Sequence, residues 1–138
     1  MGVELQKAGY TNISGMDGAA EMLARCVEKG IYRDTWEVLV GVTQIPAEAL
    51  YDAAVEGSGF DAVFCSACML KGNMPSDCYE YMLRVMRPGA HMIFTIREQY
   101  LNPETDFGMN YGPKLAGLVE QGRLELVEKV EYLKYPGL

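Results

Sequence analysis

Short apolar runs alternate with segments of helical periodicity along the chain. The strand-like runs are Thr11–Met16, Trp36–Val40, Phe60–Cys65, His91–Ile96 and Leu124–Tyr132. The segments with helical spacing are Val3–Ala8, Ala19–Lys29, Pro46–Val55, Ser76–Met86 and Pro113–Gln121. This alternation predicts an α/β domain in which parallel strands are joined by right-handed helical crossovers.

The predicted strands differ in their polar residues, and therefore in their expected burial. Phe60–Cys65 is apolar apart from Asp61, as expected of a strand that is covered on both faces. Leu124–Tyr132 alternates apolar and charged residues, which is typical of an edge or half-exposed strand. The sheet is therefore predicted to have a buried centre and a more exposed C-terminal strand.

Composition and charge narrow the functional classes. The 138 residues are 49% hydrophobic and 22% charged, as in a single globular domain. The formal net charge is −7, with both signs interspersed, which argues against a nucleic-acid partner because phosphate binding needs a basic surface. No apolar run is long enough to cross a membrane, and no secretory signal follows Met1. These features predict a cytoplasmic protein that acts on a small molecule or on another protein.

Four cysteines raise the question of metal or redox chemistry. Cys65 and Cys68 form a C-x-x-C motif, which occurs in redox pairs and as half of a zinc site. A zinc site needs further close ligands, which Cys26, Cys78 and the single histidine, His91, do not supply. We therefore predict no metal site. The favoured interpretation is reduced thiols in a reducing compartment, with Cys65 serving as a small hydrophobic residue.

Candidate binding residues follow the predicted strands, because ligands of doubly wound sheets bind beyond the carboxyl ends of strands. Asp17 follows the first strand, where a carboxylate can accept hydrogen bonds from both hydroxyls of a ribose. The alternative is that Asp17 caps the next helix. Thr43 and Ser66 follow the second and third strands and are candidates to face an adenine or a substrate. Each of them is also compatible with an ordinary loop position.

Three stretches of the sequence form a recognisable set, namely Gly9–Asp17 with Ala20–Arg25, Phe60–Phe64 and Leu83–Phe94. Together they resemble class I S-adenosylmethionine-dependent methyltransferases. Gly9–Asp17 with Ala20–Arg25 resembles the family's second strand, its ribose-binding acid and the helix that follows. Phe60–Phe64 resembles the strand that leads to the substrate side, and Leu83–Phe94 resembles the helix, proline-glycine turn and fifth strand. The turn Gly72–Pro75 and the exit Thr95–Arg97 look closest to the Williams–Beuren-region methyltransferase-like branch. The resemblance runs from about Val3 to Tyr132.

The resemblance implies a Rossmann-like three-layer α/β/α sandwich with a mostly parallel sheet. It places the family's first strand between the second and the fourth. We expect that strand, the glycine-rich loop that follows it and the last strand to be missing, so that residues 1–138 form one partial domain. Such a chain is expected to fold poorly, to pair its second strand with its fourth, or to borrow a strand, which predicts self-association through unpaired strands.

The resemblance also implies a cofactor site for S-adenosylmethionine. The implied binding residues are Met16, Asp17, Gly18, Val42, Thr43, Cys65 and Ser66. Asp17 would bind the ribose, Val42 and Thr43 would lie along the adenine, and Cys65 and Ser66 would line the methyl-donor cleft. Val42 cannot accept the hydrogen bond from the adenine amine that an acidic residue of the family often accepts. No catalytic base is predicted, because positioning the nucleophile against the sulfonium methyl supplies most of the rate.

The predicted function is therefore transfer of a methyl group from S-adenosylmethionine to an unidentified small-molecule or protein acceptor. Absence of the glycine-rich loop predicts impaired activity, because only glycine permits its close approach to the cofactor. The alternative is a non-catalytic methyltransferase-like module that pairs with a complete partner. A nicotinamide-dependent oxidoreductase shares the acid after the second strand, but the turn Arg87–Gly89 argues against it. The loop Asn102–Gly112 is a candidate wall for the acceptor site, or else packs its own aromatic residues.

Overall fold

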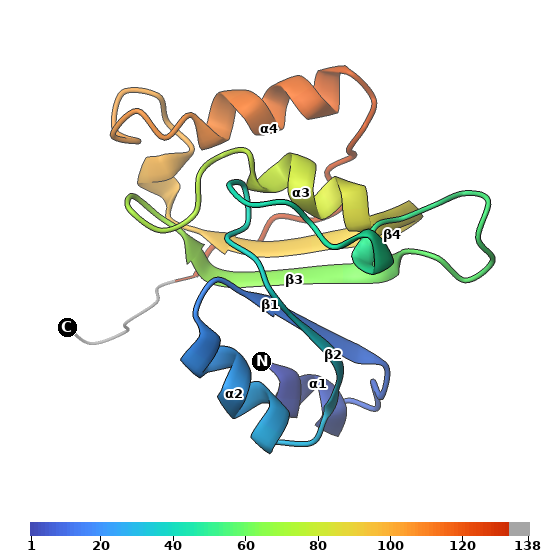
Figure 1. The fold of residues 1–138 in the computed structure, drawn as a ribbon. Helices are drawn as coiled ribbons and strands as arrows, with labels where there is room; N and C mark the ends of the chain where they lie inside the picture. Colours follow the sequence, from blue (N-terminus) through green and yellow to red (C-terminus); the bar gives the residue numbers. More distant parts are fainter. Residues whose placement is uncertain (133–138) are drawn as a thin grey trace.

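The structure is a computed structural model that describes residues 1–132. In chain order, the elements are α1 (Gly2–Lys7), β1 (Ile13–Asp17), α2 (Ala20–Glu28), β2 (Tyr32–Glu37), the 3-10 turn η1 (Ala47–Ala49), β3 (Phe60–Met69), α3 (Cys78–Val85), β4 (Met86–Ile96), the 3-10 turn η2 (Glu98–Tyr100) and α4 (Tyr111–Glu120) (Figure 1). None of these helices is both long and apolar enough to cross a membrane.

The strands form two separate parallel pairs (Figure 1). β1 pairs with β2, with Asp17 opposite Glu37, and β3 pairs with β4, with Phe64 opposite Ile93. The α/β class and the parallel pairing are thus confirmed. The sheet is not continuous within residues 1–132. Pairing of the strand predicted at Thr11–Met16 with that predicted at Phe60–Cys65 is one of the three expected outcomes of a missing central strand, and it is not seen.

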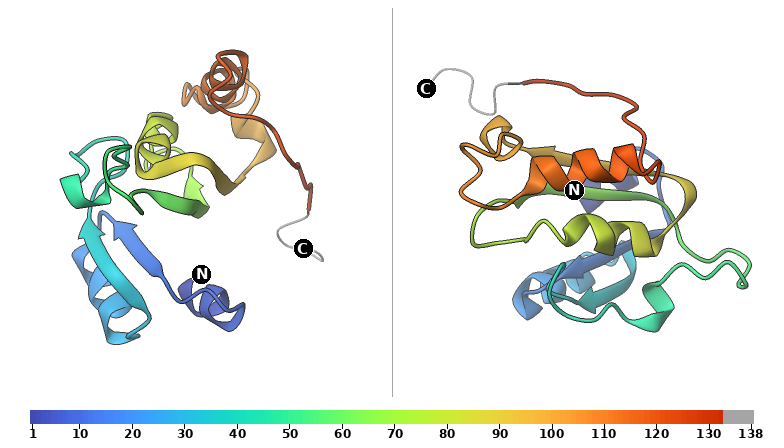
Figure 2. Two further views of the ribbon diagram at one scale, coloured as in Figure 1. Left: turned by 90° about the vertical axis from the view of Figure 1, so that its right-hand side faces the viewer. Right: turned by 90° about the horizontal axis from the view of Figure 1, so that it is seen from above.

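Each strand pair has its own helical cover. α2 packs against β1 and β2, and Figure 2 shows α3 and α4 on the side of the β3–β4 pair that faces away from β1 and β2. α2 buries Leu23 and ends at Glu28, with Lys29 as its C-cap, after which Gly30 has a φ of +64°. Glycine adopts this left-handed conformation readily, so Gly30 ends the helix without strain.

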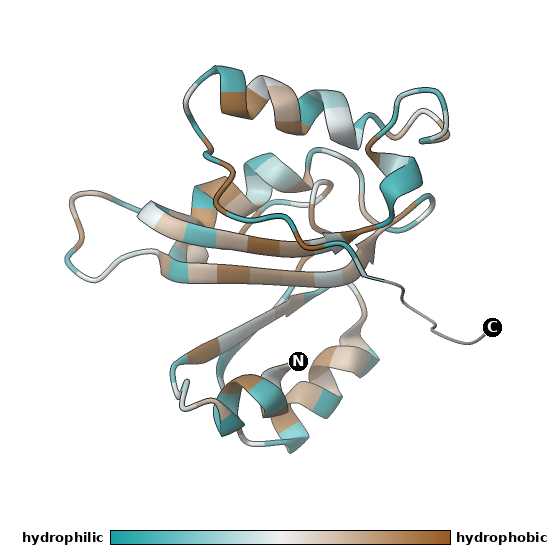
Figure 3. Cartoon of the chain, turned by 180° about the vertical axis from the view of Figure 1, so that it is seen from behind, coloured by the Kyte–Doolittle hydropathy of each residue, from teal (hydrophilic) through white to brown (hydrophobic). Residues whose placement is uncertain are grey.

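The larger hydrophobic core lies between the β3–β4 pair and the helices α3 and α4. Its buried members are Cys65, Met69, Cys78, Tyr79, Met82, Met86, Tyr100, Tyr111 and Leu118. Tyr79 and Tyr100 each pack edge to face against Tyr111, with ring centroids 6.4 Å and 5.9 Å from that of Tyr111, respectively. Seen from behind, β3 and β4 carry long hydrophobic stretches (Figure 3), on which Phe64 and Ile93 are 37% and 47% exposed.

A second, smaller core connects the two strand pairs. It consists of Ile45, Ala49 and Val85, and Met16 and Trp36 pack against it from β1 and β2. Trp36 also meets Phe60 of β3 edge to face at 6.2 Å. The link between the halves therefore depends on the connection that follows β2.

Two predicted elements do not form as expected. Leu124–Tyr132 is not a strand in the structure, because it has no strand partner in the described part of the chain, and Leu126 and Val127 are 70% and 77% exposed. The predicted helix Pro46–Val55 is reduced to the 3-10 turn at residues 47–49. The backbone then turns away because the N–H of Tyr51 donates to the carbonyl of Arg84 at 2.9 Å.

Three strand boundaries also differ from the prediction. The strand predicted at His91–Ile96 begins at Met86, which pairs with Phe60 of β3, so the predicted turn Arg87–Gly89 lies within β4. The strand predicted at Trp36–Val40 begins at Tyr32 and ends at Glu37, because the N–H of Leu39 donates instead to the side chain of Thr43. The strand predicted at Phe60–Cys65 continues to Met69. Small and apolar residues continue past Cys65, and they allow the chain to stay paired with β4.

Candidate functional site

Asp17 is the last residue of β1 and is half-buried. The N–H of Ala19 donates to its Oδ1 at 2.9 Å, which stabilises the turn into α2. The N-cap position of α2 is Ala19, which makes no side-chain capping bond, so Asp17 supports the helix start without being its cap. The other oxygen, Oδ2, makes no hydrogen bond within residues 1–132 and is left for an outside donor.

The two neighbours of Asp17 have packing roles. Met16 belongs to the hydrophobic cluster that joins the strand pairs, so its side chain does not lie at the open edge. Gly18 has no room for a side chain, because a Cβ there would overlap the side chain of Leu39. Gly18 therefore lets the turn after β1 lie against the loop after β2.

The loop after β2 contains the predicted adenine-facing residues. Val42 is 65% exposed and offers an apolar surface to solvent. Thr43 holds the loop, since its Oγ1 accepts the N–H of Leu39 at 3.0 Å and its carbonyl accepts the hydroxyl of Tyr81 at 2.6 Å. Gly41 has a φ of +87°, and a Cβ there would come within 2.6 Å of Pro75, so the loop runs directly against the segment before α3.

Cys65 and Ser66 lie within β3 rather than beyond its end, because β3 continues past them. Cys65 is 8% exposed and belongs to the larger core, which confirms that it serves as a small hydrophobic residue. Ser66 is exposed, and its carbonyl accepts a hydrogen bond from the thiol of Cys68 at 3.2 Å. All four cysteines are free thiols, as the favoured interpretation predicted.

β1 and β3 do not pair within residues 1–132, but a charge at the end of β1 reaches a thiol near the end of β3. The carboxylate of Asp17 lies close enough to Cys68 to oppose ionisation of its thiol. Cys68 is therefore the edge residue that the sequence analysis did not include, although its C-x-x-C motif was visible. Leu39 was also missed, and no sequence signal identifies it, because its contact with Gly18 depends on where β2 ends.

The thiols of Cys65 and Cys68 have opposite acidities. The hydrogen bond between them lowers the pKa of Cys68 to about 7, against the opposing effects of burial and of Asp17. The same hydrogen bond, together with burial, raises the pKa of Cys65 far above its ordinary value. Of the two thiols, Cys68 is therefore the one that loses its proton first as the pH rises.

Two surface depressions lie away from this edge. One, of about 500 Å³, is lined by residues of the loop before β3 and by Arg87 and Pro88. The other, of about 210 Å³, lies between α3 and α4. The predicted binding residues thus form an open rim, and no three histidine, cysteine or acidic side chains among residues 1–132 are grouped to hold a metal ion.

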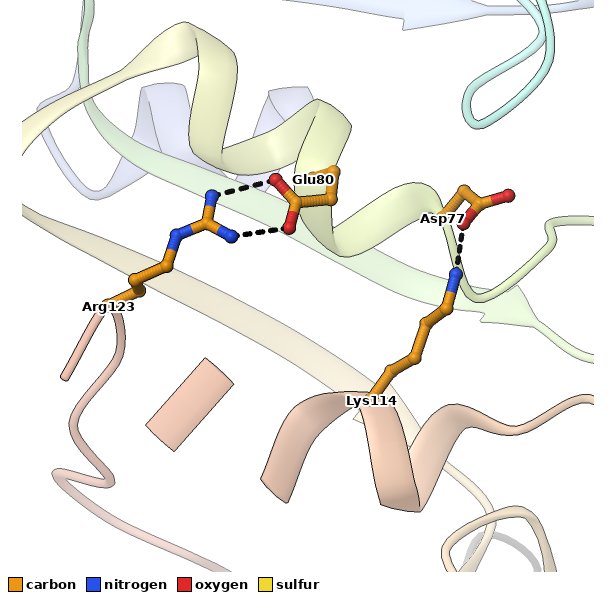
Figure 4. A network of polar contacts seen from close by, with 4 residues as sticks. All are labelled: Asp77, Glu80, Lys114 and Arg123. Atoms are coloured by element: carbon orange, nitrogen blue, oxygen red, sulfur yellow. Dashed lines mark hydrogen bonds and ion pairs between the residues drawn. The ribbon is translucent and has the colours of Figure 1, made fainter. Parts of the chain in front are cut away.

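Two ion pairs connect α3 with α4 and the residues that follow it, beside the smaller depression (Figure 4). Arg123 donates from both terminal nitrogens to Glu80, at 2.6 and 2.7 Å, and Lys114 pairs with Asp77. The hydrogen bonds from Arg123 lower the pKa of Glu80. These contacts hold α4 against α3. Because the four charged side chains are paired with one another, they are not free to bind a ligand.

Comparison with known proteins gives one result that bears on function. A family model described as "Methyltransferase domain" matches residues 3–94. The match runs from α1 almost to the end of β4 and includes every residue of the predicted cofactor site. No curated protein shows a significant match to the chain. Because the model covers well over half of the sequence, the chain belongs to the methyltransferase domain family.

Proposed function

We propose that this chain is a class I methyltransferase domain that binds S-adenosylmethionine at the carboxyl ends of β1, β2 and β3 and transfers its methyl group to a small-molecule or protein acceptor. The observation that supports this best is Asp17, a half-buried carboxylate with one unpaired oxygen at the end of a parallel strand. Ligands of such sheets bind at strand ends. The family match includes this strand and its following helix.

The proposed roles follow from what each side chain touches. Asp17 accepts the ribose hydroxyls through Oδ2, and the exposed side chain of Val42 lies along the adenine. Thr43 holds the adenine loop, and Ser66 presents a free hydroxyl at the donor side. Met16 and Cys65 act from the interior, by fixing the positions of Asp17 and Ser66. The cofactor supplies an electrophilic methyl group on a sulfonium, and the protein supplies binding and orientation.

In the same proposal, the two strand pairs are halves of one three-layer sandwich. β2–β1 and β3–β4 run parallel within each pair, and Trp36 of β2 meets Phe60 of β3 edge to face at 6.2 Å. A strand between β1 and β3 would join the pairs into one sheet. Its backbone would satisfy the edges of β1 and β3 that have no strand partner in the described part of the chain.

Thermal unfolding with and without S-adenosylhomocysteine tests the binding claim. A ligand at about a hundredfold its dissociation constant stabilises the folded state by roughly 2.7 kcal/mol, which raises the melting temperature by several degrees. The informative variant is Asp17→Asn, which keeps the oxygen that accepts the Ala19 N–H but loses the negative charge. It should melt like the parent without ligand and lose most of the ligand-dependent rise.

Glu37→Gln is the matched control, because Glu37 lies opposite Asp17 at the end of β2 and is exposed. It should keep the full rise. No rise in the parent chain would refute cofactor binding by residues 1–138, and an equal rise in Asp17→Asn would remove Asp17 from the site.

The open strand edges favour a second candidate, a non-catalytic methyltransferase-like module that pairs through its strands. β1 and β3 each have a single strand partner in residues 1–132, and the partly exposed Phe64 extends the apolar surface of β3. Sedimentation over a range of concentrations should show self-association that Phe64→Lys reduces. Val119→Lys, at an exposed position on α4, should not reduce it. A monomer at every concentration would contradict pairing between copies.

A further inference from the structure

An irregularity in β3 brings two cysteine side chains together. Between the pairs Cys65↔Phe94 and Met69↔Ile96, β3 advances by four residues while β4 advances by two. The excess is taken up around Ala67, which has a φ of +60° and whose N–H donates to the side chain of Thr95 at 2.9 Å. Ala67 is not a glycine, so this left-handed backbone is held in place by its surroundings.

The bulge changes which side chains can meet. In a regular strand, residues three positions apart point to opposite faces, so Cys65 and Cys68 would be separated by the sheet. Here four residues of β3 span the rise of two residues of β4, and Cys68 packs against the larger core of which Cys65 is a buried member. Both side chains therefore lie on the core side of β3, close together along the chain. The bulge therefore creates a dithiol that the strand alone would not.

The two sulfurs differ in their exposure to solvent as well as in the pKa of their thiols. Cys65 is buried at 8% exposure, whereas Cys68 is half-buried and carries the lowered pKa described above. The thiolate is the nucleophilic form of cysteine. Cys68 is thus placed to react with a small reagent from solvent, and Cys65 is placed to react next with Cys68.

We propose that Cys65 and Cys68 form a redox-modification site, at which a hydroperoxide converts the dithiol into an intramolecular disulfide that external thiols reverse. The Cys68 sulfur attacks the terminal peroxide oxygen, and the O–O bond breaks. The leaving oxygen takes up a proton as an alcohol, or as water when the oxidant is hydrogen peroxide, and Cys68 becomes a sulfenic acid. The Cys65 sulfur then attacks the Cys68 sulfur, the S–O bond breaks, and water leaves with the Cys65 proton. Two electrons pass from the cysteines to the peroxide.

The other two cysteines provide internal comparisons. Burial raises the pKa of Cys78 to about 12, so this thiol stays protonated even though it lies near Cys65. Cys26 is half-buried on α2, in the other half of the molecule. The site is therefore confined to the bulge, and its chemistry does not depend on methyl transfer.

Mass spectrometry of the whole chain tests the proposal directly. The reduced protein is treated with hydrogen peroxide, its free thiols are blocked with N-ethylmaleimide, and trypsin then releases Asp34–Lys71, which contains Cys65 and Cys68 but neither of the other cysteines. The expected product is this peptide without N-ethylmaleimide and lighter by two hydrogens than its reduced form. Reduction with dithiothreitol should then allow N-ethylmaleimide to label both cysteines. A peptide blocked at both cysteines, or one linked to the peptide that contains Cys78, would overturn the proposal.

The rate of alkylation against pH tests the cause of the reactivity. In the parent chain, Cys68 should react with a midpoint near neutrality. In Cys65→Ala, which removes the hydrogen-bond donor, the midpoint should move up towards about 8.5, the value of an ordinary thiol. Cys26→Ser should leave the midpoint unchanged. A midpoint for Cys68 that is ordinary in the parent, or unmoved by Cys65→Ala, would contradict the asymmetric pair.

Discussion

The two halves of the molecule have the same local architecture and very different interiors. Each consists of two parallel strands with helices on one side (Figure 2). The β3–β4 half encloses a core of nine buried residues, with three tyrosines at its centre. In the elements of the β1–β2 half, only Ile13 and Leu23 are buried apolar side chains, each at 9% exposure. The same arrangement of strands and helices is thus packed tightly in one half and thinly in the other.

Because of this difference, the stability of the candidate site depends on the β3–β4 half, although Asp17 lies in the β1–β2 half. Elements with few buried contacts open locally at a lower free energy than elements within a core. β1 and β2 are held mainly where Met16 and Trp36 meet the cluster of Ile45, Ala49 and Val85. We therefore expect the β3–β4 half to supply most of the free energy of folding. The β1–β2 half, with Asp17, should stay folded because that cluster attaches it to the other half.

Truncation at the centre of the larger core should have the largest effect. Tyr111 is fully buried, packs against Tyr79 and Tyr100, and donates its hydroxyl to the carbonyl of Met74. Tyr111→Ala should lower the free energy of unfolding by about 3–5 kcal/mol, through lost burial and a cavity. Urea unfolding followed by circular dichroism measures this change.

Leu23→Ala is the matched truncation in the other half. Leu23 retains some exposure, and its surroundings can relax, so the expected loss is about 2 kcal/mol. A loss equal to that of Tyr111→Ala would contradict the inference that the β1–β2 half is less tightly packed than the β3–β4 half.

The sequence predicts the class of the fold and most of its elements, because hydrophobic period is a local property. The helices at residues 20–28, 78–85 and 111–120 lie within a few residues of their predicted bounds. Asp17 also lies at a strand end, as the last residue of β1 and one position past the predicted strand Thr11–Met16. These predictions need no knowledge of distant contacts.

The missed features all depend on contacts between distant residues. Leu124–Tyr132 has the alternation of a strand, but a strand forms only against a neighbour, and none is present in residues 1–132. The bulge that joins Cys65 to Cys68 depends on how β3 registers with β4. A motif shows which residues are close in the chain, and only the pairing shows that these two thiols meet.

Weakening the connecting cluster should separate the two halves. Ile45 is 1% exposed, and Ile45→Ala should lower the free energy of unfolding by about 2–3 kcal/mol. Trp36, the single tryptophan, packs on this cluster, so its fluorescence reports the β1–β2 half. In the parent chain the fluorescence and circular dichroism transitions should coincide, and in Ile45→Ala the fluorescence transition should come first.

Ile45→Val is the control for this separation, because it keeps most of the packing and should cost about 1 kcal/mol with coincident transitions. Coincident transitions in Ile45→Ala would show that the halves are coupled by something other than this cluster.

The loop contact between the halves should contribute less. Gly41 has a left-handed backbone and no space for a Cβ beside Pro75, so Gly41→Ala should cost about 2 kcal/mol from strain and overlap together. Gly72 has a similar φ of +81° with open space around it. Gly72→Ala should therefore lose only about 1 kcal/mol, for the backbone alone. Equal losses in urea unfolding would show that the approach to Pro75 adds nothing.

The smallest effect should come from the ion pair between Glu80 and Arg123, which acts on the β3–β4 half alone. Hydrogen bonds from Arg123 lower the pKa of Glu80 below its ordinary value of 4.5. A carboxyl whose pKa is lower when folded stabilises the protein above its unfolded pKa, and that contribution disappears as the pH falls through the folded value. Both side chains are partly exposed, so the contribution is small and salt should weaken it. Glu80→Gln should lower the urea midpoint at neutral pH and flatten its fall below about pH 4.5, whereas Glu28→Gln, at an exposed carboxyl on α2, should do neither. If Glu80→Gln and Glu28→Gln have the same acid profile, the pair does not hold α4 to α3, and the tight packing of this half rests on its apolar core alone.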